Sequence, residues 1–319
     1  MKLVIQIPCL NEAENLPRVL EDLPREIPGV DEIEALVIDD GSTDGTFDVA
    51  RAAGVDHVVR LACTQGLARV FMIGLNEALR MGADIIVNFD ADNQYRGQDI
   101  ERLVGPILRG EADLVIGDRQ VESIDHFSPA KKGLQRLGSW VVRKVSTTDI
   151  PDATSGFRAL SREAALRMNV VTEFTYTLET IIQAGKQRLA LTHIPVMTNE
   201  QTRPSRLFST TWDYVKRSAV SIVRIYTHYE PLKTFSLLGG LFFTGGLLVG
   251  FRFLFYFWIG EGEGKVQSLI LAAVLVIVGV QVLLMGLIGD TIAANRRLIE
   301  EILYRQRKDA ETDPKEGKP

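Results

Sequence analysis

Short apolar runs alternate with segments of helical periodicity through the first 120 residues of the chain. The apolar runs are rich in β-branched residues and predict strands at residues 3–7, 35–38, 55–59, 85–89 and 114–116. Between them, apolar residues recur at three- and four-residue spacing, which predicts helices at residues 14–23, 46–53, 67–81 and 99–109. Such alternation predicts an α/β fold, a mostly parallel sheet with helices on both faces.

The polarity of the chain changes after residue 230. Residues 266–289 contain no charged side chain, and residues 234–260 contain one, Arg252. Each run is long enough to span a bilayer core of ~30 Å at ~1.5 Å per residue. We therefore expect a transmembrane hairpin of two helices, in which Gly246 and Gly250 form a small-xxx-small pair that allows close helix approach. Two buried helices of a soluble core are the less favoured interpretation, because adjacent apolar runs of this length are rare outside membranes.

Basic residues flank both ends of the hairpin, whereas its connecting loop has one Lys and two Glu. The positive-inside rule then places both ends, and the N-terminal domain, in the cytoplasm. Residues 211–229 carry an apolar stripe at helical spacing with basic neighbours, which fits an amphipathic helix in the membrane surface or one packed on the soluble core. We favour the surface, and expect four parts: a domain at 1–210, the juxtamembrane helix at 211–233, the spans at 234–290 and a charged cytoplasmic tail at 291–319, disordered from 309.

The composition excludes several function classes. A net charge of −5 argues against general binding of nucleic acid. Cys9 and Cys63 are the only cysteines and fit neither a disulfide framework nor a zinc site. The first strand is not followed by a glycine loop of the dinucleotide or P-loop type.

Polar residues collect where four of the predicted strands end. They are Pro8 to Glu12, Asp39 to Asp44, Asp90 with Asp92, and Asp118 with Arg119. Ligands of parallel sheets bind at the carboxyl ends of the strands, so these clusters predict a site. Asp90 and Asp92 point the same way in extended chain, and such a pair can bind a divalent cation, share a proton or cap a turn. Mg²⁺ commonly binds one or two carboxylates together with substrate phosphates, and Gln94 offers another oxygen.

Five segments, in this order, resemble glycosyltransferase family 2 with its Rossmann-like GT-A fold: LVIQIPCLNEAENL, ALVIDDGSTDGT, DADNQ, DLVIGDR and DATSGFRALSREA. With the basic surface segment and the hairpin, the chain resembles the polyprenyl-phosphate glycosyltransferases, such as dolichyl-phosphate mannose synthase and the undecaprenyl-phosphate hexose transferases. The resemblance implies metal-dependent transfer of a sugar, with inversion, from a nucleotide diphosphate to a polyprenyl phosphate. Mg²⁺ or Mn²⁺ is the implied cofactor, and a tetramer is the implied oligomer.

The resemblance also implies roles for individual residues. The nucleoside side comprises Pro8, Leu10, Glu12, Asp39 and Asp40, with Asp90. Asp90, Asp92 and Gln94 correspond to the residues that hold the metal and the diphosphate, and Arg119 lies in the loop that faces the acceptor phosphate. The late basic-serine motif is Arg203, Ser205 and Arg206. Residues 155–158, with the sequence Ser-Gly-Phe-Arg, lie in the acceptor-side loop and are called the Ser155 loop. Some hexose-transferring relatives have Asp directly before the Phe of this loop, where this chain has Gly156.

The chemistry of the acceptor explains why basic residues matter more than a general base. A lipid phosphate has a second pKa near ~6, so at neutral pH it is already a nucleophilic anion and needs cationic positioning. Arg119, Arg136 and Arg203 are candidates, with Ser139 and Ser205 as neutral donors. Arg136 fits equally well in a basic interfacial helix at residues 130–144.

Two other functions remain open at this point. A polymerising polysaccharide synthase of the same family would carry a Q-x-x-R-W motif and more spans, neither of which the chain has. A catalytically dead, membrane-anchored nucleotide-sugar-binding protein would not need the intact Glu12, Asp90 and Asp92. The donor (GDP-mannose, UDP-glucose or a UDP-N-acetylhexosamine) and the dolichyl or undecaprenyl nature of the lipid are not readable from these residues. These residues also do not show whether the membrane is that of the cell or that of the endoplasmic reticulum.

Overall fold

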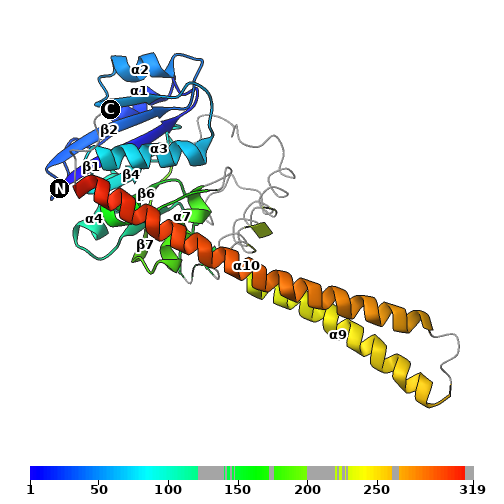
Figure 1. Ribbon diagram of the computed structural model, residues 1–319. Helices are drawn as coiled ribbons and strands as arrows, with labels where there is room; N and C mark the ends of the chain where they lie inside the picture. Colours follow the sequence, from blue (N-terminus) through cyan, green and yellow to red (C-terminus); the bar gives the residue numbers. More distant parts are fainter. Residues whose placement is uncertain are drawn as a thin grey trace. The chain divides into compact units, whose positions relative to one another are not determined.

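The computed structural model of the chain describes residues 1–120, 148–171, 176–199, 229–260 and 266–312, with single positions at 140, 142, 143, 146, 220, 223, 224 and 227 (Figure 1). Residue contacts divide the chain into two compact units. The first comprises Met1–Ser218 with Ile302–Pro319, and the second comprises Ala219–Glu301.

The strands described in the first unit form one seven-stranded sheet in the order β3-β2-β1-β4-β6-β5-β7. Their bounds are β1 Lys2–Cys9, β2 Glu32–Asp39, β3 His57–Arg60, β4 Ile85–Asn88, β5 Leu114–Asp118, β6 Arg158–Ser161 and β7 Leu191–Pro195. Only β6 is antiparallel to its neighbours, β4 and β5. The prediction of a mostly parallel sheet is confirmed.

Helices cover both faces of this sheet, as predicted. Their bounds are α1 Leu16–Glu21, α2 Thr46–Ala52, α3 Leu67–Arg80, α4 Asp99–Leu108, α6 Arg162–Arg167 and α7 Tyr176–Lys186. Leu3, Ile5 and Ile7 of β1 share one buried cluster with α1 and α4. On the other face α3 approaches β1 closely, since a Cβ at Gly74 would lie 2.6 Å from Gln6 Oε1. The alternation of β1 side chains thus sends odd and even positions to opposite layers.

The sheet topology brings the chemistry to one edge. β1, β2, β4 and β5 run in the same direction, so the polar residues that follow them gather at their carboxyl ends. β6 enters the sheet at this edge, where Arg158 pairs with Asn88 of β4 and with Ile116 of β5. The turn that precedes β6 therefore lies beside the residues that follow β4.

The second unit contains α9 (Pro231–Trp258) and the first part of α10 (Val266–Thr312), both candidate membrane spans by length and composition (Figure 1). The helices touch through small residues, because a Cβ at Gly239, Gly246 or Gly279 would lie within 3.0 Å of backbone atoms of the other helix. A Cβ at Gly250 would meet only the Ala272 Cβ, at 3.7 Å. Close approach is therefore confirmed at Gly246, and its partner along α9 is Gly239, not Gly250.

The helix α10 continues well beyond residue 289, where the second apolar run ends. The expectation of disorder from residue 309 is wrong for 309–312, which are helical. From Ile302 onward the helix belongs to the first unit and docks on α6. Tyr304 Oη donates to Glu163 Oε1 at 2.9 Å, and Arg307 Nη1 donates to the carbonyl oxygens of Leu166 and Met168. These contacts and good helix formers account for the extra turns.

Candidate active site

Two loops at the sheet edge are tied together by side chains. Asn11 follows β1 with a φ of 55°, and its backbone N–H donates to Ser42 Oγ at 2.9 Å. Its side-chain oxygen accepts from the Thr43 N–H at 2.9 Å. The N–H of Glu12 donates to Thr46 Oγ1 at 2.9 Å. The loops after β1 and β2 thus form one surface, from which Leu10 is exposed and in which Glu12 is buried.

The adjacent carboxylates Asp39 and Asp40 differ in their partners. Asp40 accepts the backbone N–H groups of Gln65 and Gly66 at 2.6 Å and 3.0 Å, so it holds the loop that leads into α3. Asp39 is fully buried, and its Oδ1 accepts the Ser42 N–H. Asp39 Oδ2 makes no hydrogen bond to the described residues and lies 3.6 Å from Arg60 Nε. Because buried polar atoms usually have a partner, Asp39 Oδ2 is the better candidate for a ligand contact.

The predicted pair Asp90 and Asp92 follows β4 directly, and both residues are partly buried. Burial, and secondly the charge of Asp92, raise the pKa of Asp90 to about 7, although Arg119 and Arg158 oppose the shift. Asp92 Oδ1 accepts the N–H of Gln94 at 3.0 Å. The carbonyl of Gln94 accepts from the Asn199 N–H at 2.9 Å, which ties this loop to the chain after β7.

This pair fits a divalent cation. The charge of Asp92 opposes the ionisation of Asp90, and a cation beside both carboxylates would favour the charged form. No cluster of three or more His, Cys, Asp or Glu ligands occurs among the described residues. Mg²⁺ and similar cations typically bind one or two protein carboxylates and complete their shell with water and substrate phosphate. Asp90 and Asp92 are the residues that would hold the cation.

Asn88, the last residue of β4, is a buried residue of the site that the sequence did not reveal. Its Nδ2 donates to the Tyr176 hydroxyl at 2.9 Å and to the Gly156 carbonyl at 3.0 Å, with Asp90 Oδ1 at 3.4 Å. Its Oδ1 accepts from Gln6 Nε2 at 2.9 Å. A polar residue inside an otherwise apolar strand was the only available signal.

Gly156 lies directly against Asp90. A Cβ at this glycine would lie 2.5 Å from Asp90 Oδ2 and 3.0 Å from the Tyr176 hydroxyl. The position where some relatives have Asp therefore has no room for any side chain here, because the Asp90 carboxylate occupies that space.

Arg119 forms a forked ion pair with Asp152, which the sequence did not predict. Nε donates to Oδ2 at 2.7 Å and Nη2 to Oδ1 at 3.0 Å, and Nη2 also donates to Thr154 Oγ1 at 2.8 Å. Burial alone would raise the pKa of Asp152, but Arg119 lowers it below its ordinary value. Nη1 of Arg119 makes no hydrogen bond to the described residues, so Asp152 orients the guanidinium and leaves one donor group available.

Arg158 of the Ser155 loop is fully buried, and its guanidinium is held by protein groups. Its Nη1 donates to the Thr177 carbonyl at 3.2 Å and to the Thr180 hydroxyl, and Nη2 donates to the Ser155 carbonyl. No carboxylate of the described residues forms an ion pair with it. Burial raises the pKa of Asp90, and the positive charge of Arg158 is one of two that oppose this rise.

Several predicted residues lie outside the described part of the chain. They are Arg136, Ser139, Arg203, Ser205 and Arg206, together with most of the predicted amphipathic helix at 211–233. Their roles remain predictions.

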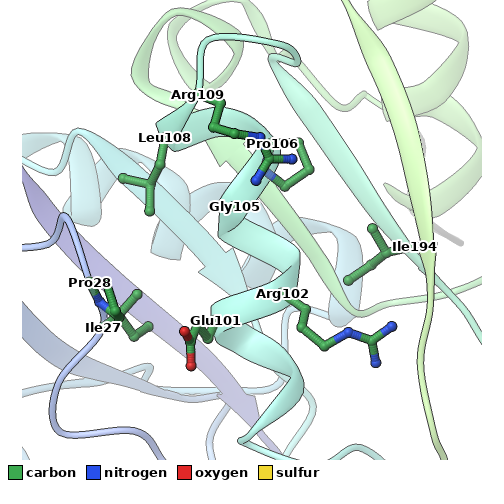
Figure 2. Close-up of a pocket in the computed structure, with 9 residues that line it drawn as sticks. All are labelled: Ile27, Pro28, Glu101, Arg102, Gly105, Pro106, Leu108, Arg109 and Ile194. Carbon is green, nitrogen blue, oxygen red and sulfur yellow. The ribbon is translucent and has the colours of Figure 1, made fainter.

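A pocket of about 500 Å³ lies elsewhere on the first unit (Figure 2). Its lining comes from α4, the loop at Ile27 and Pro28, and Ile194 of β7. Figure 2 shows Arg102, Arg109 and Glu101 around it, and none of the candidate site residues lines it. The pocket is therefore separate from the candidate site.

Known proteins resemble this chain in sequence and fold. Glycosyltransferase AglJ of Haloferax volcanii is 28% identical over 303 residues, which cover 92% of this chain and 94% of that protein. The dolichol-phosphate mannosyltransferase of Pyrococcus furiosus is 27% identical over 268 residues, covering 81% and 72% of the two chains. Glucosyl-3-phosphoglycerate synthase from Mycobacterium tuberculosis, solved with Mn²⁺, UDP and glucosyl-3-phosphoglycerate, has a TM-score of 0.55 at 20% identity and covers 71% of this chain and 78% of that one.

The last of these similarities confirms the fold, and a family model supplies the identity. The model described as Glycosyl transferase family 2 matches residues 4–167, slightly more than half of the chain. This range contains the strand ends and the residues Asp39, Asp90, Asp92, Arg119 and Asp152. The chain belongs to glycosyltransferase family 2.

Proposed function

We propose that this enzyme transfers a hexose from a nucleotide diphosphate sugar to the phosphate of a polyprenyl phosphate, with inversion at the anomeric carbon. The observation that carries the proposal is the juxtaposition at one sheet edge of a paired carboxylate, Asp90 with Asp92, and an oriented guanidinium, Arg119. The two apolar helices and the polyprenyl- and dolichol-phosphate mannosyltransferases among the relatives support a lipid acceptor.

The donor side comprises the tied loops after β1 and β2. In this proposal the buried Asp39 Oδ2, which has no hydrogen-bond partner among the described residues, accepts a hydrogen bond from the nucleoside, and Pro8, Leu10 and Glu12 complete the nucleoside side. Asp90 and Asp92 would hold Mg²⁺ or Mn²⁺, and Mn²⁺ accompanies UDP in the structure of glucosyl-3-phosphoglycerate synthase. When bound, the cation supplies positive charge for the leaving diphosphate. Gln94, whose backbone N–H donates to Asp92 Oδ1, would offer a further oxygen from its side chain.

The acceptor side centres on Arg119. Asp152 fixes two of its donor groups, and the remaining Nη1 can donate to a phosphate oxygen without any change of the ion pair. Asp152 Oδ2 accepts from Arg119, and Asp152 Oδ1 accepts from Arg119 and Thr154. Because its carboxylate is saturated and its pKa is low, Asp152 does not serve as a general base. A lipid phosphate needs none, since it is already ionised at neutral pH.

We also propose that the catalytic unit faces the cytoplasm, because basic residues flank both candidate spans and the positive-inside rule then applies. The remaining basic candidates, Arg136, Arg203 and Arg206, would complete the acceptor side with Ser139 and Ser205. Homo-oligomers, tetramers included, are compatible with the apolar residues exposed on α9 and α10.

The test is transfer by the purified full-length protein in lipid nanodiscs. Radiolabelled GDP-mannose, UDP-glucose and UDP-N-acetylglucosamine are each supplied with Mg²⁺ or Mn²⁺ and with dolichyl or undecaprenyl phosphate. We expect lipid-extractable label without polymer from one donor, and loss of that label in Asp92→Asn. Absence of label in the lipid phase with every donor and both lipids would overturn the proposal. Polymer in the aqueous phase would instead identify a polysaccharide synthase.

A further inference from the structure

Asn88 connects the two sides of the proposed site. It lies at the end of β4, two residues before Asp90, and its side-chain amide donates to the carbonyl of Gly156 in the turn before β6. The same amide nitrogen has Asp90 Oδ1 at 3.4 Å and the Tyr176 hydroxyl at 2.9 Å. One side chain thus contacts the donor-side carboxylate, the acceptor-side turn and the start of α7.

The hydrogen bonds at residue 88 need a side chain that both accepts and donates, as an amide does. Burying an amide costs free energy unless its hydrogen bonds are made, so a buried strand residue with no other role is usually apolar. The Asn88 oxygen is held by Gln6, which leaves the NH₂ group facing three acceptors. Its orientation is therefore fixed from behind by β1, and its donors point toward the site.

The Ser155–Phe157 turn, whose Gly156 carbonyl accepts from Asn88, packs tightly against the Asp90 carboxylate. The Gly156 α-carbon faces Asp90 so closely that a Cβ would come to 2.5 Å from Oδ2 and 3.0 Å from Oδ1. A small displacement of this turn would therefore move the Asp90 carboxylate. The Tyr176 hydroxyl, which also contacts Asn88, belongs to a buried ring that is stacked on Phe71 at 4.1 Å between ring centroids.

We propose that Asn88 is a positioning residue that holds the Ser155–Phe157 turn against the Asp90 carboxylate, and so sets the geometry of the metal-binding pair. The inference rests on the proposed function for the role of Asp90 and Asp92. It assigns to Asn88 no contact with substrate.

The test measures metal binding and stability apart from turnover. Full-length Asn88→Ala is compared with the unaltered protein by Mn²⁺ electron paramagnetic resonance in the presence of UDP or GDP, by thermal unfolding, and by kcat. We expect Mn²⁺ affinity to fall by about 10- to 100-fold, the range typical for a residue that orients a metal ligand. Because the affinity is lower, the metal concentration that gives half-maximal activity should be higher.

A buried amide remote from the site provides the matched control. Gln183 of α7 is 1% exposed, and its Nε2 donates to the Asn169 carbonyl while its Oε1 accepts the Asn169 N–H. Gln183→Ala should lower the unfolding temperature as Asn88→Ala does, yet keep Mn²⁺ affinity and kcat. Should Asn88→Ala not fold, Asn88→Leu decides, because it removes the hydrogen bond to the Gly156 carbonyl and keeps nearly the same side-chain shape in the buried site.

The outcomes separate the two proposals. If the unaltered protein binds no Mn²⁺ with either nucleotide, the metal site of the proposed function fails, and the inference fails with it. If that protein binds Mn²⁺ and transfers sugar, but Asn88→Ala (or Asn88→Leu in its place) behaves like Gln183→Ala, only the inference is overturned.

Discussion

The carboxylate of Asp152 accepts two hydrogen bonds from the guanidinium of Arg119, at 2.7 Å and 3.0 Å, in a partly buried setting. The Arg119 side chain is 11% exposed and that of Asp152 is 3% exposed. Removal of one partner from such a pair leaves an uncompensated charge, which typically costs about 3–5 kcal/mol.

We therefore predict that Asp152→Asn is destabilised and impaired with the lipid acceptor. The unfolding temperature should fall, and the KM for polyprenyl phosphate should rise while the KM for the nucleotide sugar changes little. Glu111→Gln is the matched control, because the Arg109–Glu111 pair is also forked but is exposed. Equal stability and equal lipid KM in both variants would contradict the role given to Asp152.

The glycines of α9 provide a second prediction. Gly246 faces α10, where its Cβ would lie 2.8 Å from Val276 N, whereas a Cβ at Gly245 would have nothing within 4 Å. Gly246→Leu should force the helices apart at a cost of about 1–3 kcal/mol or more, as overpacking does. Thermal unfolding in nanodiscs measures this. Gly245→Leu, one residue away, should unfold near the unaltered temperature, and a similar loss in both would show that helix packing is not responsible.

The docking of α10 on α6 should depend on pH. Although burial tends to raise the pKa of Glu163, its hydrogen bonds with Arg167 and Tyr304 lower it below the ordinary value of 4.5. A carboxyl group with a lowered pKa contributes its full stabilisation above the ordinary pKa and loses it as the pH falls further. The contact should therefore be intact at neutral pH and weaken below about 4.5.

Hydrogen–deuterium exchange, corrected for intrinsic rates, reports this contact in residues 302–309. Protection should decrease between pH 5 and pH 3 in the unaltered protein. Glu163→Gln lacks the titrating group, and its protection should be low at neutral pH and change less across the same range. Unchanged protection of the unaltered protein at pH 3 would refute the dependence.

The two cysteines should react very differently with thiol reagents. Burial raises the pKa of the Cys9 thiol well above its ordinary value, and Cys63 is exposed. Cys63 also lies beside the loop after β2, since a Cβ at Gly41 would touch its backbone at 2.9 Å. Mass spectrometry should find one modified thiol in the folded protein and two after denaturation. Saturating UDP or GDP should slow the modification of Cys63, and an unchanged rate with both would contradict the nucleoside position.

The sequence was sufficient to predict the strands and the sheet edge at which the polar residues gather. Apolar runs followed by Asp39, Asp90 and Asp118 identified strands whose carboxyl ends meet at this edge. It could not predict the partners of Arg119 and Asp90, because these depend on β6, a four-residue strand without a distinctive pattern. Its antiparallel insertion between β4 and β5 brings Asp152 and Gly156 to the site.

The hairpin shows a similar division between composition and geometry. Composition predicted both apolar helices, and the first ends at Trp258, close to the predicted boundary. The contact face depends on how two helices are rotated against each other, so spacing alone could not distinguish Gly239 from Gly250. The extra turns of α10 depend on Tyr304 and Arg307, whose partners in α6 lie about 140 positions earlier in the chain.

The return of residues from Ile302 onward to the first unit has a consequence for biogenesis. A ribosome completes the seven-stranded sheet before it synthesises either apolar helix, and supplies Tyr304 and Arg307 only after both. The contacts of Tyr304 and Arg307 with α6 therefore form only after both helices of the hairpin have been synthesised, and until then this surface of α6 is not covered by them. During this interval the side chains of Glu163 and Arg167, which are 41% and 29% exposed in the folded chain, are more accessible to chaperones and membrane-insertion factors that bind nascent chains.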